Sequence, residues 1–243
     1  MPGELLSVLH DAVKIVNFIK AHPLNSRIFR TICNEMAGEH ETLQLHTEVR
    51  WLSRGKVLAR IFELRCEVQE FFVHNPFHLS LCLQDDIWLQ KLAYLADIFS
   101  TLNELNLSLQ GLSSTIFNTQ DKVKALIKEL LFWANWINTN STDCFPLLSE
   151  FLQSREAVLS DCVKGIIIEH LNQLRQNLRT YFPPMDQSQT WIRNPFDVTP
   201  PIPHLSFQEQ EQLLELSSDG RHNILFKNKS LVHFWASAMM EHP

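Results

Sequence analysis

The residues best suited to carry chemistry form a short basic segment that contains a tryptophan. Between Thr47 and Arg65 there are five basic and two acidic residues, so the segment carries +3 in a chain whose formal net charge is −6. Cationic side chains at the start of a helix can hold a phosphate together with free backbone N–H groups, and a tryptophan ring can stack on an unpaired base. The pattern therefore indicates a candidate DNA-binding site, formed by Arg50, Trp51, Arg54, Lys56 and Arg60.

The same segment also has a structural interpretation. Trp51 can be a core side chain, and the arginines can pair with Glu48 and Glu63. Charge and spacing alone favour this interpretation over DNA binding. Because the whole chain is acidic, its overall charge would not attract nucleic acid, and DNA binding would depend on this local patch.

The remaining polar residues give no recognised catalytic pattern. The sequence contains no glycine-rich nucleotide-binding loop, no GxSxG motif and no HExxH motif. Asp97 and Glu104 lie seven residues apart on one expected helix face, and we interpret them as part of a solvated face rather than as a catalytic pair. His10 and His170 lie on apolar helix faces and are expected to be partly buried. We therefore expect no enzymatic activity and no cofactor.

Four residues could be considered as zinc ligands, namely Cys66, His74, His78 and Cys82. Their spacing matches no structural zinc site, because Pro76 between the histidines breaks the helical geometry that would bring them together. We expect no bound metal.

Apolar residues recur every three to four positions along most of the chain, which predicts an all-α fold. The expected helices cover 4–21, 53–74, 86–110, 119–138 and 160–181, with a further helix capped by Asn25 and short helices near 207–216 and 230–240. Residues 43–49 predict either a short strand or an extended loop. The clearest period lies in 86–110, where Leu95 and Phe99 are expected to face the core, and where Asn106 either fixes the helix register or is solvated.

Turn residues and composition predict how the helices are divided. Asn118 is expected to cap 119–138 with Asp121 in a capping box, and Gly111 to end the preceding helix. We expect a helical domain at 1–183 and a proline-containing extension at 184–243 with short helices packed on the same domain. A content of 45% hydrophobic residues supports a sizeable core and excludes disorder as the main state.

The cysteines and the apolar runs bear on location. The five cysteines are an odd number, are widely scattered and form no CxxC pair, which favours a reduced intracellular protein. The first residues do not resemble a signal peptide, and charged or polar residues interrupt every apolar run before it could span a membrane. We expect no membrane association, and either a nuclear or a cytoplasmic location.

Several ungapped blocks of the sequence can be compared with known families. The first is His46-Thr47-Glu48-Val49-Arg50-Trp51-Leu52-Ser53-Arg54-Gly55-Lys56-Val57-Leu58; the others cover 62–65, 92–99, 102–111, 181–183 and 191–196. These blocks resemble transposase-derived proteins of the hAT superfamily. They are similar to the transposase-like tails of vertebrate proteins that also carry BED zinc fingers, SCAN domains or general transcription factor II-I repeats. The blocks occur in order along nearly the whole chain, and their combination makes the resemblance specific.

The resemblance implies the helical insertion domain of an RNase H-like transposase. In that family two catalytic aspartates lie on strands before the insertion, a glutamate follows it, and an Arg-Trp pair within it lies near the flipped base during DNA cleavage. Arg50-Trp51 matches that pair by motif, whereas no block here matches the strands or the segment that carry the acids. Two-metal phosphoryl transfer needs such carboxylates. We therefore expect a domesticated fragment that lacks the catalytic sheet and is catalytically inactive.

These expectations lead to one main function and one alternative. The main one is a protein-interaction module in the nucleus, with nuclear proteins as its partners and the cytoplasm as the alternative location. The alternative is weak DNA binding without sequence specificity through Arg50 and Trp51. A truncated product without a selected function is the third possibility, and the oligomeric state stays open.

Overall fold

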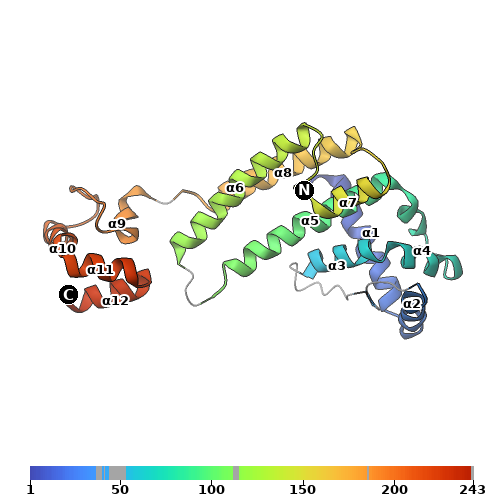
Figure 1. Cartoon of the computed structure of the whole chain (residues 1–243), viewed down its shortest axis with the longest axis horizontal. Helices are drawn as coiled ribbons and strands as arrows, with labels where there is room; N and C mark the ends of the chain where they lie inside the picture. The colour runs from blue at the N-terminus through green and yellow to red at the C-terminus, as the bar shows by residue number, and fades with distance from the viewer. Residues whose placement is uncertain (37–39, 41, 44–52, 112–114, 185, 242–243) are drawn as a thin grey trace. The chain divides into compact units, whose positions relative to one another are not determined.

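In a computed structural model of the chain, every element of the described residues is a helix (Figure 1). The described residues are 1–36, 40, 42–43, 53–111, 115–184 and 186–241, without the side chains of 53, 54 and 187. The expected all-α class is confirmed for this part of the chain. Its identity as the insertion domain of an RNase H-like transposase stays a prediction, and the expected strand or loop at 43–49 lies outside the described residues except for Leu43.

The helices fall into an N-terminal series and a C-terminal series. The first series is α1 (Gly3–Lys20), α2 (Pro23–Glu35), α3 (Ser53–Glu63), α4 (Arg65–His74), the 3₁₀ turn η1 (Ser80–Gln84), α5 (Asp86–Ser108), α6 (Ile116–Asn138), α7 (Pro146–Ser154) and α8 (Asp161–Tyr181). The second series is η2 (Gln187–Gln189), α9 (Thr190–Arg193), α10 (Phe207–Ser218), α11 (Gly220–Asn228) and α12 (Leu231–Glu241).

The chain divides into two compact units, each with its own buried core. The first unit consists of Met1–Gln110 with Lys122–Tyr181, and the second consists of Gly111–Asp121 with Phe182–Pro243. In this division residues 111–121 belong with the C-terminal segment, and the boundary lies between Tyr181 and Phe182, whereas the expected boundary lies between residues 183 and 184. The expectation that the C-terminal extension packs on the first domain stays a prediction.

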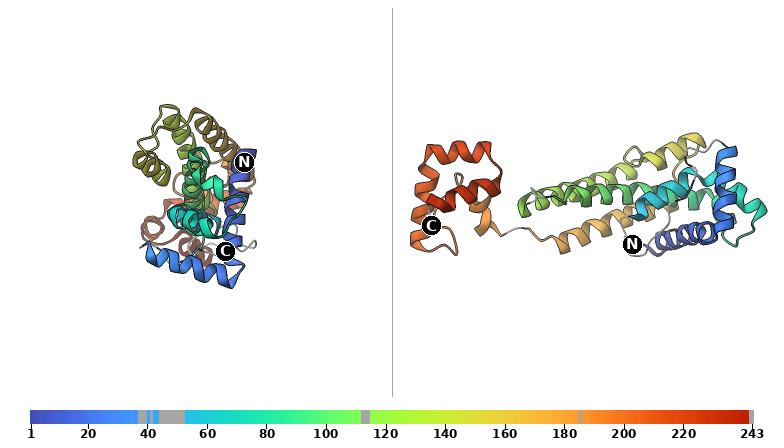
Figure 2. Two further views of the ribbon diagram at one scale, coloured as in Figure 1. Left: turned by 90° about the vertical axis from the view of Figure 1, so that its right-hand side faces the viewer. Right: turned by 90° about the horizontal axis from the view of Figure 1, so that it is seen from below.

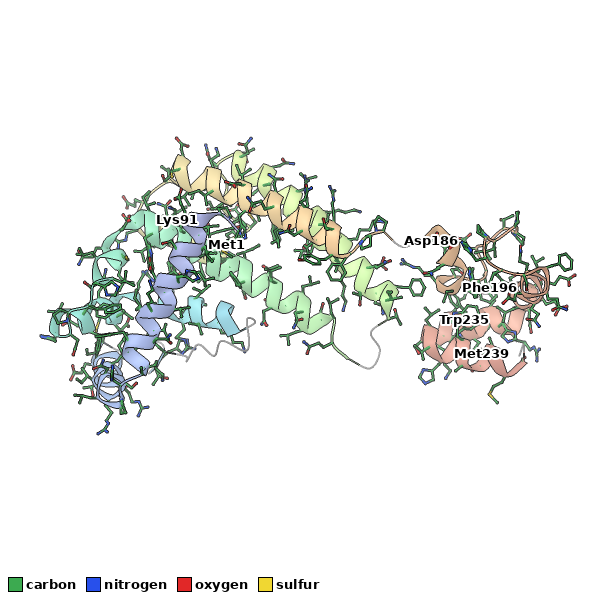
Figure 3. The ribbon with its side chains drawn as sticks, turned by 180° about the vertical axis from the view of Figure 1, so that it is seen from behind. Met1, Lys91, Asp186, Phe196, Trp235 and Met239 are labelled. Atoms are coloured by element: carbon green, nitrogen blue, oxygen red, sulfur yellow. The ribbon has the colours of Figure 1, made fainter. Side chains whose placement is uncertain are left out.

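The first unit is organised around α5. Twelve consecutive residues of this helix, Trp88 to Phe99, are buried, whereas its last two turns are more open. Helices α1, α3, α7 and α8 contact it, so it is covered on several sides, and its buried stretch is mostly apolar with Gln90, Lys91 and Asp97 as the polar exceptions. Leu95 and Phe99 face the core as expected. The buried Lys91 is neutralised by an ion pair with Glu4 of α1, and Figure 3 labels its position.

The contact between α3 and α5 depends on a glycine. A Cβ atom added to Gly55 of α3 would lie 3.1 Å from the backbone carbon and oxygen of Phe99 and 3.2 Å from the nitrogen of Ser100. Since these neighbours are backbone atoms of α5, they cannot move aside as a flexible side chain could. The glycine therefore lets α3 lie closer to α5 than any larger residue would.

Helices α6 and α8 complete the first unit. Figures 1 and 2 show α6 running back along α5, with α8 beside them. Leu126, Leu130 and Ile137 of α6 join the main core. Tyr94 of α5 and His170 of α8 are joined by a hydrogen bond of 2.8 Å between the phenol oxygen and the imidazole Nδ1, and Phe145 packs edge-on against the Tyr94 ring.

Several expected helix boundaries are wrong in detail. The expected helix 53–74 is two helices, because Leu64 leaves helical geometry with φ −90° and ψ 23°. Asn25 does not cap α2, which begins at Pro23; its Nδ2 instead donates to the carbonyl of Phe18 at the end of α1. Asn118 lies inside α6, and its backbone N–H donates to Thr115 Oγ1, so Thr115 provides the cap.

The second unit has a small aromatic core. Phe234 of α12 is fully buried and packs against Phe196, Phe226 and Trp235. Trp235 Nε1 donates a hydrogen bond of 2.7 Å to the carbonyl of Ile192; Figure 3 labels Phe196, Trp235 and Met239. Helix α11 was not expected from the sequence, although Asp219 caps it by accepting from the backbone N–H of Arg221.

Within the described part of the chain, none of the helices is both long enough and apolar enough to cross a membrane.

Candidate functional site

The structure describes only part of the candidate DNA-binding site. Arg50 and Trp51 lie outside the described residues, and for Arg54 only the helical backbone is described. Lys56 is exposed on the first turn of α3. The helix position that the sequence predicts for Arg54, Lys56 and Arg60 is therefore observed, because all three lie on α3.

Arg60 is held by neighbouring residues rather than presented to solvent. Its side chain is 20% exposed, its Nε lies 3.2 Å from Glu63 Oε2, and its Nη1 donates to the carbonyl of Thr42 at 3.4 Å. Glu63 is also 3.3 Å from His40 Nε2. The pairing of an arginine with Glu63 is thus the one that the structural interpretation of this segment predicts.

Arg65 is the other basic residue of the segment whose side chain is described. Its Nη1 donates to the carbonyl of Phe62 at 2.9 Å, and its guanidinium lies 4.7 Å from the centre of the Phe62 ring and 5.8 Å from that of Phe151. Because the Arg65 guanidinium already contacts two aromatic rings, it is less available to bind an anion. Of the described basic side chains in this segment, Lys56 is therefore the one most available to an anion.

The interpretation of Asp97 as a solvated residue is wrong. Its carboxylate is buried and accepts the backbone N–H groups of Leu147 and Leu148 at 3.2 and 3.1 Å. These are first-turn N–H groups of α7, which have no partner within that helix. Burial raises the pKa of Asp97 to about 6, although the two hydrogen bonds oppose the shift. Glu104 is exposed, so the two carboxylates do not form a pair.

The two histidines that were expected to be partly buried differ in their exposure. His170 is buried as expected; burial lowers its pKa to about 4, and the positive N-terminus of the chain adds to the effect. His10 lies on the exposed side of α1, so its expected burial is wrong. Burial raises the pKa of the Cys144 thiol to about 11, which removes it as a thiolate nucleophile at neutral pH. His170 therefore acts as a neutral structural hydrogen-bonding partner of Tyr94, and Cys144 stays a thiol.

A surface that sequence reasoning missed lies on α6. Four residues spaced by four positions are exposed on the side away from its buried residues, and we name them the α6 stripe: Lys124, Lys128, Phe132 and Trp136. The Phe132 and Trp136 rings stack with their centres 5.3 Å apart and an interplanar angle of 27°. Phe132 is 55% and Trp136 40% exposed, and Leu131 beside them is 41% exposed.

The sequence contained a signal for this surface. Leu126, Leu130 and Ile137 recur at helical spacing and are buried, so the aromatic residues spaced by four on the opposite side of α6 point outward. Trp133 is half-buried and packs edge-on against Phe145.

No group of three or more histidine, cysteine, aspartate or glutamate side chains that could hold a metal ion occurs among the described residues. Cys66 is exposed at the start of α4, and Cys82 is half-buried in η1.

Comparison with known proteins identifies a family for the segment that contains α1 to α6. The model of the FAM200/GTF2IRD2 helical domain matches residues 4–138, which is more than half of the 243 residues and ends with the last residue of α6. That domain is related to transposase-derived proteins, which agrees with the resemblance in the sequence blocks at this coarser level. No solved structure matches the chain. The matched residues include the first sequence block, α5 and the α6 stripe, and the chain belongs to the FAM200/GTF2IRD2-like helical domain family.

Proposed function

We propose that this chain is a domesticated, catalytically inactive transposase-derived protein of the hAT type that acts in the nucleus as a protein-interaction module. The observation that carries the proposal is the α6 stripe. The large aromatic side chains of Phe132 and Trp136 are half-exposed next to each other on α6, and the opposite side of this helix is buried in the core. A contiguous exposed apolar surface of this kind is typical of a protein–protein contact.

The ionisable groups support the inactive part of the proposal. Asp97 caps α7, Glu63 binds Arg60, and Asp121 binds Arg193 through two hydrogen bonds of 3.0 and 2.6 Å. Each of these carboxylates is engaged by a neighbouring backbone N–H or arginine group of the fold. Phosphoryl transfer by two metal ions would require carboxylates that converge on a shared site.

The test is affinity capture from nuclear extract with the wild-type chain and a Phe132→Ala/Trp136→Ala double variant. We expect the double variant to lose most of the specifically captured proteins, because the rings provide the apolar contact area. Phe207→Ala is the matched control, because Phe207 is a still more exposed aromatic residue, in the other unit. Equal capture by the wild type, the double variant and the control would contradict the proposal.

Weak DNA binding is the second candidate function. It is supported by Lys56, which is exposed on α3, and by the motif match of Arg50-Trp51. Neutralising about three phosphates would give a salt slope near −3 and an affinity that is micromolar or weaker. In this case Trp51→Ala should remove a preference for hairpin or single-stranded ends, because those bases can stack on an exposed indole ring.

A further inference from the structure

The two lysines of the α6 stripe are unpaired and adjacent on the helix. Lys124 and Lys128 are both exposed, and neither forms an ion pair or hydrogen bond with any described residue. They are separated by one helical turn, where like charges repel and destabilise the helix. The carboxylate three residues before Lys124 is Asp121, and Arg193 engages both of its oxygens.

The other carboxylate on α6, that of Glu129, lies at a different part of the helix surface from the two lysines. Glu129 lies with Lys122 in a shallow hollow between α5 and α6, whose volume is about 310 Å³. The stripe therefore presents two uncompensated positive charges in its N-terminal half and two aromatic rings in its C-terminal half. Lys124 and Trp136 are twelve residues apart, which is about 18 Å along a helix at 1.5 Å per residue.

We propose that the α6 stripe is the docking surface for an amphipathic helix of another protein that carries acidic residues at one end of its apolar face. Carboxylates of that partner would lie against Lys124 and Lys128, and its aliphatic side chains would cover Phe132, Trp136 and Leu131. The surface extends over about three helical turns, which suits a partner helix laid along it. This inference rests on the proposed function and specifies the chemistry of its partner.

Two features of the stripe favour a protein helix over single-stranded nucleic acid. The Phe132 and Trp136 rings stack on each other, so one face of each ring is already covered and less aromatic surface remains for bases. Two lysines would neutralise about two phosphates, which provides little affinity at physiological salt. The net charge of −6 opposes a polyanion at longer range, although a compact acidic helix can still pair with the lysines locally.

The experiment titrates the full chain into two fluorescently labelled peptides and records anisotropy. The first probe is a helical peptide with leucines at every third and fourth position and glutamates beside them; the second has lysine at each glutamate position. We expect the acidic peptide to bind at least tenfold more tightly than the basic one. We also expect Lys124→Glu/Lys128→Glu to reverse this preference, and Phe132→Ala/Trp136→Ala to weaken binding of the acidic peptide at least tenfold.

The control is Lys227→Glu, a charge reversal at an exposed lysine of α11, which should leave binding unchanged. Circular dichroism of every variant verifies the fold, and Trp136→Leu, which keeps an apolar side chain, should retain most of the binding. The inference is overturned if the wild type does not prefer the acidic peptide, or if the stripe variants bind as the wild type does.

Two further outcomes would also overturn it. One is tighter binding of a single-stranded oligonucleotide that depends on the same four residues; the other is concentration-dependent dimerisation through the stripe in analytical ultracentrifugation. Failure here is distinguishable from failure of the proposed function. If capture of nuclear proteins is lost with the stripe variants although neither peptide binds, the interaction module stands and the acidic partner is wrong.

Discussion

At the scale of single residues, the main finding is that buried polar side chains hold neighbouring helices together. Asp97 caps α7 from α5, and Tyr94 joins α5 to His170 of α8. Sequence spacing predicted the burial of His170, because it lies on an apolar face. It could not predict Asp97, since the groups that desolvate and bond this carboxylate come from a helix fifty residues away.

Asp97 and His170 should make opposite contributions to the pH dependence of stability. The pKa of Asp97 is raised from 3.8 to about 6, so its contribution is present below pH 3.8 and is lost as pH rises through about 6. The pKa of His170 is lowered from 6.5 to about 4, so its contribution is present above pH 6.5 and is lost as pH falls through about 4. Each shift corresponds to about 3 kcal/mol.

Single variants should therefore separate the two groups. Between pH 6.5 and 4.5, Asp97→Asn should lose free energy of unfolding more steeply than the wild type on acidification, and His170→Asn less steeply. Urea unfolding at the two pH values measures this, and the difference between variant and wild type cancels the titration of other carboxylates. Parallel pH profiles for all three proteins would show that neither group is perturbed.

Gly55 and Gly165 provide a matched pair of helical glycines. Gly55→Ala should destabilise the chain by about 1–3 kcal/mol, because the new methyl group would meet the α5 backbone at 3.1 Å. Gly165→Ala on α8 should instead stabilise it by about 0.5–1 kcal/mol, because an added Cβ would have no neighbour within 4 Å. Thermal or urea unfolding gives both values; a stabilising Gly55→Ala would mean that α3 and α5 are not in close contact.

At the scale of elements, the long periodic segments and two of the short helices were predictable: the short helices expected near 207–216 and 230–240 are observed as α10 and α12. The expected helices at 4–21, 86–110, 119–138 and 160–181 are observed as α1, α5, α6 and α8 within a few residues. Helices α7 and α11 were missed, although Pro146 at the first position of α7 and the Asp219 cap of α11 are local start signals. The break at Leu64 has no comparable signal, because the apolar period continues across it.

The central role of α5 can be tested by two leucine truncations on the same helix. Leu95→Ala should reduce the free energy of unfolding by about 2–5 kcal/mol, because Leu95 is fully buried. Leu107→Ala should cost less than about 0.5 kcal/mol, because Leu107 is 57% exposed. Urea unfolding of both variants provides the measurement, and equal losses would mean that α5 is not buried along its first half.

At the scale of the whole molecule, the chain contains two units with separate cores. The sequence indicated a change near 183 from its prolines, but not that residues 111–121 join the C-terminal segment, because that grouping depends on contacts between residues far apart in the chain. The match to the FAM200/GTF2IRD2 helical domain covers 4–138, whereas most of the second unit lies beyond it.

Because the two cores are separate, removal of a core side chain from one unit should destabilise that unit and leave the other unchanged. Phe234→Ala removes the fully buried centre of the second core and should destabilise that unit by about 3–5 kcal/mol. Hydrogen exchange followed by mass spectrometry should then show loss of amide protection in α10, α11 and α12, with α5 unchanged. Equal loss of protection in α5 would show that the two units unfold together.

We propose that this chain acts by binding protein rather than by binding or cutting DNA. The most direct test is a fluorescence polarisation titration of hairpin and duplex DNA at about 50 and 200 mM salt, where phosphate contacts are strongly and weakly favoured respectively. We expect no saturable binding at either salt concentration. Saturable hairpin binding that weakens with salt with a slope near −3, and that Arg50→Ala or Trp51→Ala abolishes without unfolding the chain, would contradict it.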